Sequence, residues 1–286
     1  MDFVLKNAKT DSKRELSLLK KIGLPLIMGI VNITPDSFYD GGKYLDQEKA
    51  VALGIQLAID GADMLDVGGQ STRPGSESVG PEEQMDRICP VIEKLRAETD
   101  IIISVDTTSS RVAGEAISLG AEIVNDISAL RFDPEMIGTV VRNKVGLILM
   151  HMKGTPKDMQ SHPHYSDIVK EISGFLSERV DVAQQAGVNP LMIAIDPGIG
   201  FGKTVEGNLQ LLKEIGAFKK LHKPVLIGAS RKSFIGDLTG ADVNDRLPGS
   251  LAVACFSALN GVDILRVHDV KETLAALKMI TALNRR

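Results

Sequence analysis

The sequence predicts an α/β barrel of eight parallel strands, because strand-like and helix-like segments alternate eight times along the chain. Eight apolar runs have the length of buried strands, and each of them ends in a polar or charged residue. They are Leu24–Asn32, Ala62–Asp66, Ile101–Asp106, Ala121–Asn125, Val145–His151, Leu191–Asp196, Val225–Ser230 and Asp263–Arg266. The carboxyl ends of the strands converge on one face of such a barrel. The eight polar endings therefore predict a ring of hydrogen-bonding groups around one small polar ligand.

The segments between these runs have the spacing of amphipathic helices, with apolar residues three or four positions apart. Three clear stripes are Met85, Ile88, Ile92 and Leu95; Ile168, Ile172, Phe175, Val180 and Ala183; and Val270, Leu274, Leu277 and Ile280. Four predicted helices end in a glycine that suits a left-handed cap, and a strand follows at once: Gly61, Gly120, Gly187 and Gly261. This repeated joint favours one (β/α)8 TIM barrel over an open doubly wound sheet.

The barrel is expected to form a single domain over residues 23–286, with residues 1–22 packing on its bottom as a hairpin or strap. Long loops are expected after strands 1, 2 and 7, because ordinary connections take about 2–6 residues. These loops are Ile33–Asp46, Gly68–Pro81 and the partly helical Lys232–Pro248. The first two are rich in Gly, Pro and Ser and project from the polar rim, where such loops commonly act as lids. Surface decoration is the alternative interpretation.

Composition excludes several classes of partner. The 286 residues are 43% hydrophobic and 24% charged, which is typical of a globular protein. The formal net charge of −4 provides no general attraction to nucleic acid or to an anionic membrane. The two cysteines, Cys89 and Cys255, are far apart in helical patterns, which favours a reducing cytoplasm over a disulfide framework. The sequence shows neither a signal peptide nor an apolar run long enough to span a membrane, so a cytoplasmic location is expected.

Seven short segments occur in order, each at a predicted strand end, and together they resemble the dihydropteroate synthase family. They are MGIVNITPDSFYDGG (28–42), GGQSTRPG (68–75), SVDT (104–107), NDIS (125–128), DPGIGFGKT (196–204), GASRKSFIG (228–236) and RVHDV (266–270). The resemblance runs from about residue 25 to the C-terminus. It implies a transferase that joins 6-hydroxymethyl-7,8-dihydropterin diphosphate to p-aminobenzoate, giving 7,8-dihydropteroate and pyrophosphate for folate synthesis. It also implies that Mg²⁺ assists departure of the diphosphate and that the protein is a sulfonamide target.

A pterin ring presents N–H donors along its 2-amino-4-oxo edge, so its site needs acceptors. By resemblance, the pterin ligands are Asp106, Asn125, Asp196 and Lys232, with Met150 and Phe201 against the ring faces. The carboxylate and amide oxygens end the third, fourth and sixth strands, where they could meet those donors. A lone strand-end Asp serves equally well as a helix cap, but three such groups in matching motifs favour a site.

Arg266 and His268 end the eighth strand, beside the start of the last helix, where barrels commonly bind phosphate. By resemblance both bind the diphosphate, and Asn32 gives Mg²⁺ a side-chain oxygen, a ligand type that this ion accepts. The implied p-aminobenzoate subsite is Phe38, Thr72, Arg73, Pro74, Ser230 and Lys232, and the implied catalytic residues are Arg73, Lys232, Arg266 and His268. Lys203 follows a P-loop-like glycine run, but Pro197 occupies the first glycine position, so no phosphate site is predicted there.

Three hypotheses stay open on sequence alone: an active synthase, a pterin-binding paralogue that has lost catalysis, and a related methyltransferase with a corrinoid partner. The TPDSF loop, SRK and RVHD fit diphosphate and aminobenzoate better than a methyl donor, which favours the first two. Gln70 and Tyr39 replace the usual Glu and Ser of the family, which bears on the lids rather than on the reaction class. The resemblance also implies a homodimer through outer helices near the C-terminus, and the apolar run Leu251–Leu259 is compatible with it.

Overall fold

The computed structural model describes residues 4–6, 13–15, 24–34, 43–71, 75–161 and 163–284. Eight strands form its main sheet: β3 (Leu26–Asn32), β4 (Met64–Gly68), β5 (Ile102–Asp106), β6 (Ile123–Asp126), β7 (Gly146–Met150), β8 (Ile193–Asp196), β9 (Leu226–Ile227) and β10 (Ile264–Val267). Three of them extend beyond the predicted runs, since β4 continues to Gly68, β6 to Asp126 and β10 to Val267. Asp66 therefore lies inside a strand, not at its end.

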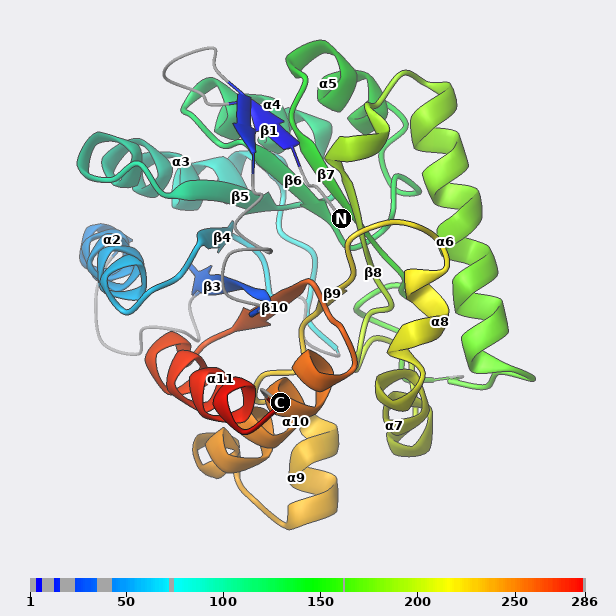
Figure 1. Cartoon of the computed structure of the whole chain (residues 1–286). Helices are drawn as coiled ribbons and strands as arrows, with labels where there is room; N and C mark the ends of the chain where they lie inside the picture. The colour runs from blue at the N-terminus through cyan, green and yellow to red at the C-terminus, as the bar shows by residue number, and fades with distance from the viewer. Residues whose placement is uncertain are drawn as a thin grey trace.

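The sheet has the order β8-β7-β6-β5-β4-β3-β10-β9, with every adjacent pair parallel (Figure 1). A further parallel bridge joins Ile195 to Val225 and brings the two outer strands together. The sheet thus curls round to meet its own edge, and the predicted (β/α)8 TIM barrel is confirmed.

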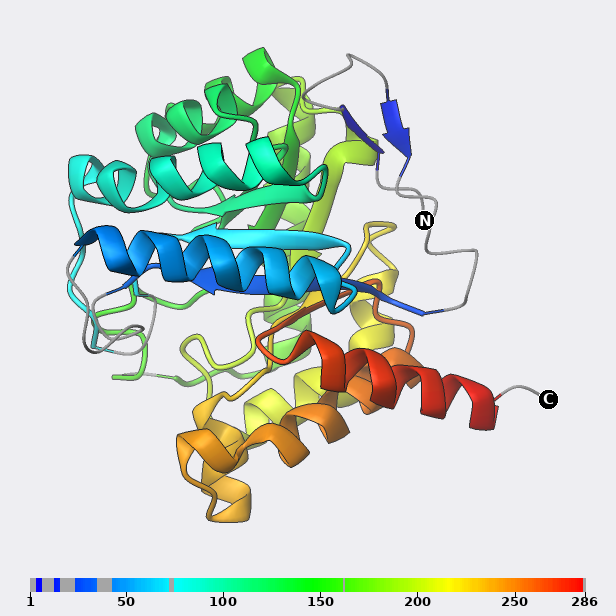
Figure 2. The ribbon, with the colours of Figure 1, turned by 90° about the vertical axis from the view of Figure 1, so that its left-hand side faces the viewer.

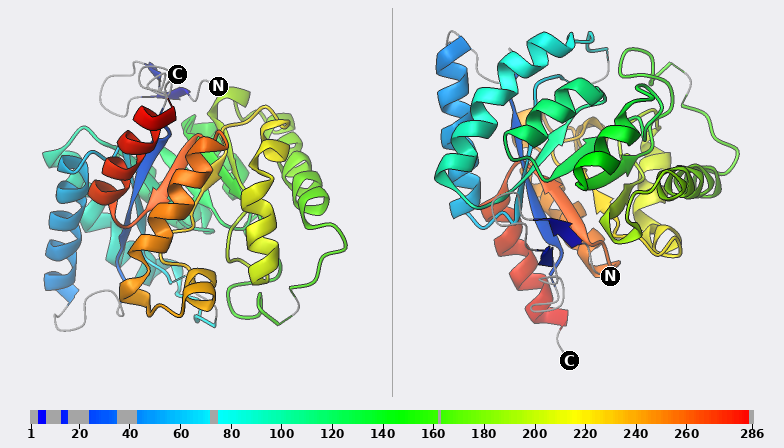
Figure 3. Two further views of the ribbon diagram at one scale, coloured as in Figure 1. Left: turned by 60° about the horizontal axis from the view of Figure 1, so that its bottom comes forward. Right: turned by 90° about the horizontal axis from the view of Figure 1, so that it is seen from above.

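Helices surround the strands in the views of Figures 1 and 3. Their bounds are α2 (Lys43–Ile59), α3 (Pro81–Glu98), α4 (Ser110–Ser118), α5 (Met136–Asn143), α6 (Ile168–Gln185), α7 (Val205–Lys213), α8 (Ile215–Lys219), α9 (Ser233–Thr239), α10 (Leu247–Leu259) and α11 (Val270–Asn284). The predicted stripe of α3 is confirmed, because Ile88, Ile92 and Leu95 are fully buried. The four glycines at the predicted helix–strand joints all have positive φ, between 82° and 107°. Each chain reversal therefore uses the left-handed region that glycine enters without steric cost.

Side chains along each strand alternate between the helix layer and the barrel interior, as the period of two requires. Leu65 and Val67 of β4 belong to the large apolar core shared with the helices. Met64 belongs instead to a second cluster, made of one or two residues from each strand, that fills the barrel. Asp66 and Gly68 have the parity of Met64 and face this interior. The same parity directs the polar groups near the carboxyl ends of the other strands toward the barrel mouth.

The connections after β3, β4 and β9 occupy residues 33–42, 69–80 and 228–246, and the third contains α9 and the 3₁₀ turn η3 (Val243–Asp245). The connection after β7 is also long, covering residues 151–167, and was not among the three long loops predicted from the sequence. Near the N-terminus, β1 (Val4–Lys6) and β2 (Lys13–Glu15) pair antiparallel. This hairpin lies at the end of the barrel where the strands begin, with β1 against the turn η2 (Pro190–Met192) (Figure 2). Among the described helices, none has both the length and the apolar character needed to cross a membrane.

Candidate active site

The structure gathers most of the predicted site residues at the carboxyl ends of the strands. Asn32, Asp106, Met150 and Asp196 end β3, β5, β7 and β8, Asn125 and Arg266 lie on β6 and β10, and Phe201, Ser230, Lys232 and His268 follow β8, β9 and β10. Asp106, Asn125 and Asp196 are each less than a tenth exposed, so their polar groups face partners or ligand rather than bulk water. Phe38, Thr72, Arg73 and Pro74 lie outside the described residues.

A hydrogen-bonded network links four strands at the floor of this mouth. Arg266 donates from Nε to Oδ2 of Asp66 at 2.6 Å and from Nη2 to Oδ2 of Asp106 at 3.0 Å. Asn125 donates from Nδ2 to the same Asp66 oxygen at 2.9 Å. Asp66, which the sequence placed among the polar strand ends but not among the predicted ligands, therefore contacts two of those ligands. The signal that could have identified it is a charged residue in the buried run MLDVG, at the inward parity of Met64.

Burial raises the pKa of two carboxyl groups that are predicted to bind the pterin, those of Asp106 and Asp196. The pKa of Asp106 is raised to about 7 by burial and by the nearby charge of Asp66, against the opposing effect of Arg266. The pKa of Asp196 is raised to about 6 by burial, although the backbone N–H of Gly198 and the charges of neighbouring cations oppose this rise. Both carboxyls therefore titrate close to neutral pH, and a ligand with N–H donors will favour their ionised forms.

Cationic and apolar groups complete the mouth. The Lys232 Nζ atom lies 3.9 Å from the centroid of the Phe201 ring, a cation–π contact between the loops after β9 and β8. Phe201 and Met150 belong to one small buried cluster, separate from the main core, together with Ile127, Met152 and Met159. The two predicted ring-face residues thus lie in a single apolar wall beside the polar floor.

The segment that carries Ser230 and Lys232 is fixed by its central residue. Arg231 has φ of +56°, a conformation that costs energy for a residue other than glycine. Its guanidinium forms an ion pair with Asp269, with Nε 3.0 Å from Oδ2, and its backbone N–H donates to Oγ of Ser250 at 2.9 Å. These contacts join the loop after β9 to α10 and to the residue that precedes α11.

His268 is held neutral beside this segment. Burial and the charge of Arg266 lower its pKa to about 3, so the imidazole carries no charge at neutral pH. Its backbone N–H donates to Oγ of Ser230 at 3.3 Å, and its Nδ1 lies 3.0 Å from the same oxygen. Ser230 can therefore donate its own hydrogen to Nδ1, which places the ring proton on Nε2.

Comparison with known proteins agrees with this geometry. The family model for pterin binding enzymes matches residues 28–268, most of the chain. The dihydropteroate synthase of a Synechocystis species is 45% identical over 258 residues, which cover 90% of this chain and 89% of that protein. The Escherichia coli dihydropteroate synthase is 41% identical, with 90% and 91% coverage. This chain belongs to the dihydropteroate synthase family.

Solved structures of dihydropteroate synthases extend the likeness over the entire fold. The Xanthomonas albilineans enzyme with 4-aminobenzoic acid matches with a TM-score of 0.91 and 43% identity, and the match covers 100% of both chains. The complex of a Xanthomonas albilineans dihydropteroate synthase with 7,8-dihydropteroate matches with a TM-score of 0.87 and 42% identity, covering 99% of both chains. These relatives are synthases, so the comparison favours this family over the methyltransferase hypothesis.

Two groups near the dihydropteroate synthase motifs do not join the polar ring. His151, predicted as a ring member, follows the inward-facing Met150 and therefore turns outward, with its ring 4.9 Å from that of Phe175 in α6. Lys203 is buried, and its Nζ donates to the carbonyl oxygen of Phe201 at 2.8 Å and lies 3.2 Å from Nδ1 of His151. Protein groups thus surround this amine, and the absence of a phosphate site at Lys203 stays a prediction.

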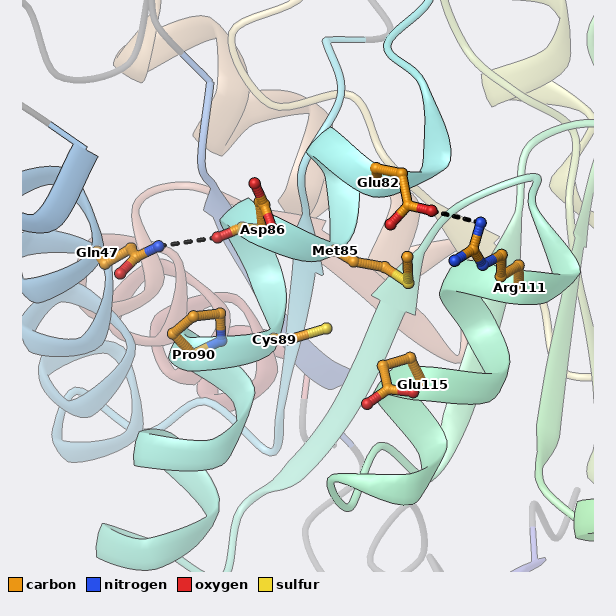
Figure 4. Close-up of a pocket in the computed structure, with 8 residues that line it drawn as sticks. All are labelled: Gln47, Glu82, Met85, Asp86, Cys89, Pro90, Arg111 and Glu115. Atoms are coloured by element: carbon orange, nitrogen blue, oxygen red, sulfur yellow. Dashed lines mark hydrogen bonds and ion pairs between the residues drawn. The ribbon is translucent and has the colours of Figure 1, made fainter.

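A cavity of about 510 Å³ also lies in the outer helical layer, between α3 and its neighbours (Figure 4). Its arginine, Arg111, is paired with Glu82 at 2.5 Å. Burial, Glu115 and Asp86 raise the pKa of the Cys89 thiol to about 11, so the thiol stays protonated and is a poor nucleophile. The cation of this cavity is paired with Glu82 and both side chains are exposed, whereas the acceptors Asp106, Asn125 and Asp196 of the barrel mouth are buried.

Proposed function

We propose that this member of the dihydropteroate synthase family transfers the 7,8-dihydropterin-6-ylmethyl group from its diphosphate to p-aminobenzoate. The products are 7,8-dihydropteroate, for folate synthesis, and pyrophosphate. One observation carries the proposal: the buried acceptors Asp106, Asn125 and Asp196 share a single barrel mouth with the cations Lys232 and Arg266. A pterin diphosphate has N–H donors at one end and negative charge at the other, so it is complementary to both halves of this mouth.

In this proposal the pterin lies deep in the mouth. Its N–H donors face the oxygens of Asp106, Asn125 and Asp196, and its ring packs against the apolar wall that contains Met150 and Phe201. Lys232 lies over that wall, where its Nζ would face the heteroatoms of the ring. The family resemblance supports these roles. Because all three acceptors are buried, a ligand without matching N–H donors would leave them without hydrogen bonds and would bind poorly.

The diphosphate binds Arg266 and His268 in this account. Arg266 uses Nε and one N–H of Nη2 for Asp66 and Asp106, so its remaining N–H groups are available for phosphate oxygens. His268, neutral and with its proton on Nε2, donates one hydrogen bond without adding charge. These groups stabilise the negative charge that develops on the departing pyrophosphate.

A magnesium ion fits the site as a companion of the substrate. Within the described ranges, no group of three or more His, Cys, Asp or Glu residues could hold a metal. A Cβ atom at Gly68 would lie 3.4 Å from Oδ1 of Asn32 and 3.7 Å from Oδ2 of Asp106, so both oxygens border the same bare backbone. One amide oxygen at Asn32 suits Mg²⁺, which keeps several waters and takes phosphate oxygens as ligands. When bound, the ion would neutralise charge on the diphosphate.

The amine of p-aminobenzoate is neutral at pH 7 and needs no strong base. The C–O bond between the pterin methylene and the diphosphate breaks, its electron pair leaves with pyrophosphate, and the amine forms the new C–N bond and loses a proton. Rate enhancement then comes from positioning and from stabilisation of the leaving group. We assign the aminobenzoate subsite to Phe38, Thr72, Arg73 and Pro74 with Ser230 and Lys232, on the strength of the family resemblance.

We also propose that the chain forms a homodimer in the cytoplasm, with residues 23–286 as one domain and residues 1–22 packed on it. The supporting observation is a set of exposed apolar side chains on α10 and α11, which lie side by side (Figure 3). Phe256, Leu259, Met279 and Leu283 are each 42% or more exposed. Sedimentation of the wild-type protein as a monomer at micromolar concentration would contradict the dimer.

Product analysis tests the proposed reaction. The purified protein is incubated with 6-hydroxymethyl-7,8-dihydropterin diphosphate, p-aminobenzoate and Mg²⁺, and the mixture is analysed by mass spectrometry. We expect a mass equal to that of 7,8-dihydropteroate, which disappears when Arg266→Ala replaces the wild type. A wild-type protein that binds the pterin diphosphate but forms no such product would instead be a paralogue without catalysis.

A further inference from the structure

The carboxylate of Asp66 is fully buried in the barrel interior, yet its described hydrogen bonds go to two site residues and not to the scaffold. Oδ2 accepts from Nδ2 of Asn125 at 2.9 Å and from Nε of Arg266 at 2.6 Å. Its other oxygen, Oδ1, has no hydrogen-bond partner among the described residues. Burying a carboxylate is costly for folding, and within the described part of the chain no backbone N–H or helix cap is hydrogen-bonded to this one. The contacts of Asp66 therefore point to the site.

The contact with Asn125 fixes the direction of an amide. A carboxylate oxygen only accepts hydrogen bonds, so the group that Asn125 turns toward Asp66 must be Nδ2. The amide oxygen then lies on the opposite side of Cγ and is available as an acceptor. Rotation of this amide by 180° would bring two acceptors together at Asp66 and present a donor in place of the acceptor. Asp66 thereby determines which hydrogen-bonding character Asn125 offers to a ligand.

The contact of Asp66 with Arg266 fixes the orientation of a second group, the guanidinium. The guanidinium is planar, and its Nε and Nη2 atoms are bound by Asp66 and Asp106, which lie on adjacent strands. Two carboxylates along one edge of the planar group define its orientation, and the remaining N–H groups point along its other edges. One oxygen of Asp66 thus fixes both the Asn125 amide, whose oxygen is the acceptor, and the Arg266 guanidinium, which is the cation.

We propose that Asp66 is a positioning residue that locks the Asn125 amide as an acceptor and holds the Arg266 guanidinium, and so sets the specificity of the site for ligands with N–H donors. This proposal rests on the proposed function. Asp66 does not touch the ligand in this proposal, but acts on it through Asn125 and Arg266. Because the role is exerted through Asn125, removing either residue should have the same consequence for the pterin ring.

A double-mutant cycle with 6-hydroxymethylpterin tests this role. Dissociation constants are measured by titration calorimetry for wild type, Asp66→Ala, Asn125→Ala and the double variant, and the melting temperature of each is recorded separately. We expect Asp66→Ala and Asn125→Ala each to weaken binding by about ten-fold or more. The double variant should bind within about two-fold of Asn125→Ala, because the amide that Asp66 orients is already gone.

Asp126→Ala is the matched control. Asp126 is also a buried carboxylate, on the strand β6 that carries Asn125, but its oxygens accept from the backbone of Ser128 and Leu130 and from the Ser128 hydroxyl. Measured at pH 8, where Asp106 is mostly ionised in either protein, this variant should melt earlier and keep its affinity for the pterin. If Asp66→Ala behaves in this same way, with early melting and unchanged affinity, the residue is part of the scaffold and the proposal is wrong.

A swap variant keeps the test decisive if Asp66→Ala does not fold. Asp66→Asn combined with Asn125→Asp conserves volume and total charge, and the new carboxylate at 125 offers an acceptor in either orientation. We expect it to bind 6-hydroxymethylpterin within about three-fold of wild type, since an acceptor is again fixed at 125. Weak binding by a folded swap variant would contradict the proposal. A wild-type protein that bound no pterin would overturn the proposed function as well, whereas normal wild-type binding with additive effects in the cycle would overturn this inference alone.

Discussion

The Nη2 atom of Arg266 lies 3.0 Å from Oδ2 of Asp106. The residue proposed to bind the diphosphate and a residue proposed to bind the pterin are therefore hydrogen-bonded to each other before any substrate binds. Asp106 is buried beside Asp66, and its pKa of about 7 reflects a balance between burial, that second carboxylate and the guanidinium. A change at one end of the substrate site therefore alters the electrostatics at the other.

Pterin binding should strengthen as pH rises through the range of about 6 to 7 and then level off. The pKa is raised to about 7 at Asp106 and to about 6 at Asp196, so the free protein holds protons on both carboxyls at lower pH. The N–H donors of a pterin bind the ionised forms, so these protons must leave first. The groups that act on Asp106 are Asp66 and Asp126, which oppose ionisation, and Arg266 and Lys232, which favour it.

Titration calorimetry with 6-hydroxymethylpterin across this range measures the effect, and Asp106→Asn should flatten much of the profile. The same acidities have the opposite effect on folding. The folded protein binds more protons than the unfolded chain between the ordinary pKa of 3.8 and the raised values, so the contribution of these groups to stability falls as pH rises over that interval and is lost once the pH passes the raised values of about 6 and 7. Pterin affinity that is constant or falls over this range would contradict the assignment of both carboxyls.

Asp106→Asn and Asp196→Asn should each weaken pterin binding by about 1–3 kcal/mol at pH 8, because an acceptor is replaced by a group that is half donor. Their melting temperatures should be unchanged or higher, since each substitution removes a buried charge. Asp63→Ala is a useful control, because this half-buried carboxylate at the opposite end of the barrel accepts from the backbone N–H of Ile27 at 2.7 Å. It should lower stability and leave pterin affinity intact. Early melting with normal pterin affinity in the two site variants would identify them as structural.

Mg²⁺ with pyrophosphate should raise the melting temperature of the wild type, despite its net charge of −4, because ligands of the folded state stabilise it. Arg266→Ala should abolish most of this shift. Lys203→Ala should lower the melting temperature of the free protein but keep the ligand-induced rise, since the amine of Lys203 in the wild type contacts Phe201 and His151. Differential scanning fluorimetry gives both values, and the reverse ranking of the variants would move the phosphate site to the loop after β8.

Much of the barrel and of its polar floor could be predicted from the sequence, because strand length and polar strand ends are local features. Asp106, Asn125 and Asp196 were identified in this way, helped by their motifs. His151 and Asp66 show where local patterns are insufficient. Whether a strand-end residue faces the mouth depends on its parity within the strand, and Met150 takes the inward position that the pattern gave to His151. Asp66 was predicted to end its strand, although β4 continues beyond it.

Other parts of the site depend on contacts between distant segments. The pairing of Lys203 with His151 joins residues on two loops, and no local pattern indicates it. The ion pair of Arg231 with Asp269 depends on a left-handed backbone that non-glycine residues adopt only when the fold imposes it. The aminobenzoate subsite at Phe38, Thr72, Arg73 and Pro74 stays a prediction from the family resemblance, because these residues lie outside the described part of the chain.

Aminobenzoate use should depend on Phe38 and Arg73 far more than pterin diphosphate binding does. We expect Phe38→Ala and Arg73→Ala to raise the KM for p-aminobenzoate by about ten-fold or more and to change the pterin diphosphate dissociation constant by less than about three-fold. We also expect p-aminobenzoate to bind the wild type poorly alone and well with pyrophosphate and Mg²⁺, as a subsite completed by the first ligand would. Equal affinity under the two conditions would argue against this order.

The most direct test of the account is the release of pyrophosphate from 6-hydroxymethyl-7,8-dihydropterin diphosphate, with and without p-aminobenzoate and in the presence of Mg²⁺. If the chain is a synthase, pyrophosphate should accumulate with p-aminobenzoate in a one-to-one ratio to dihydropteroate. It should do so far more slowly when the amine is omitted or when Arg266→Ala replaces the wild type. A wild-type protein that binds the pterin diphosphate tightly, yet releases no more pyrophosphate with p-aminobenzoate than without it, would contradict the assignment and identify a pterin-binding paralogue.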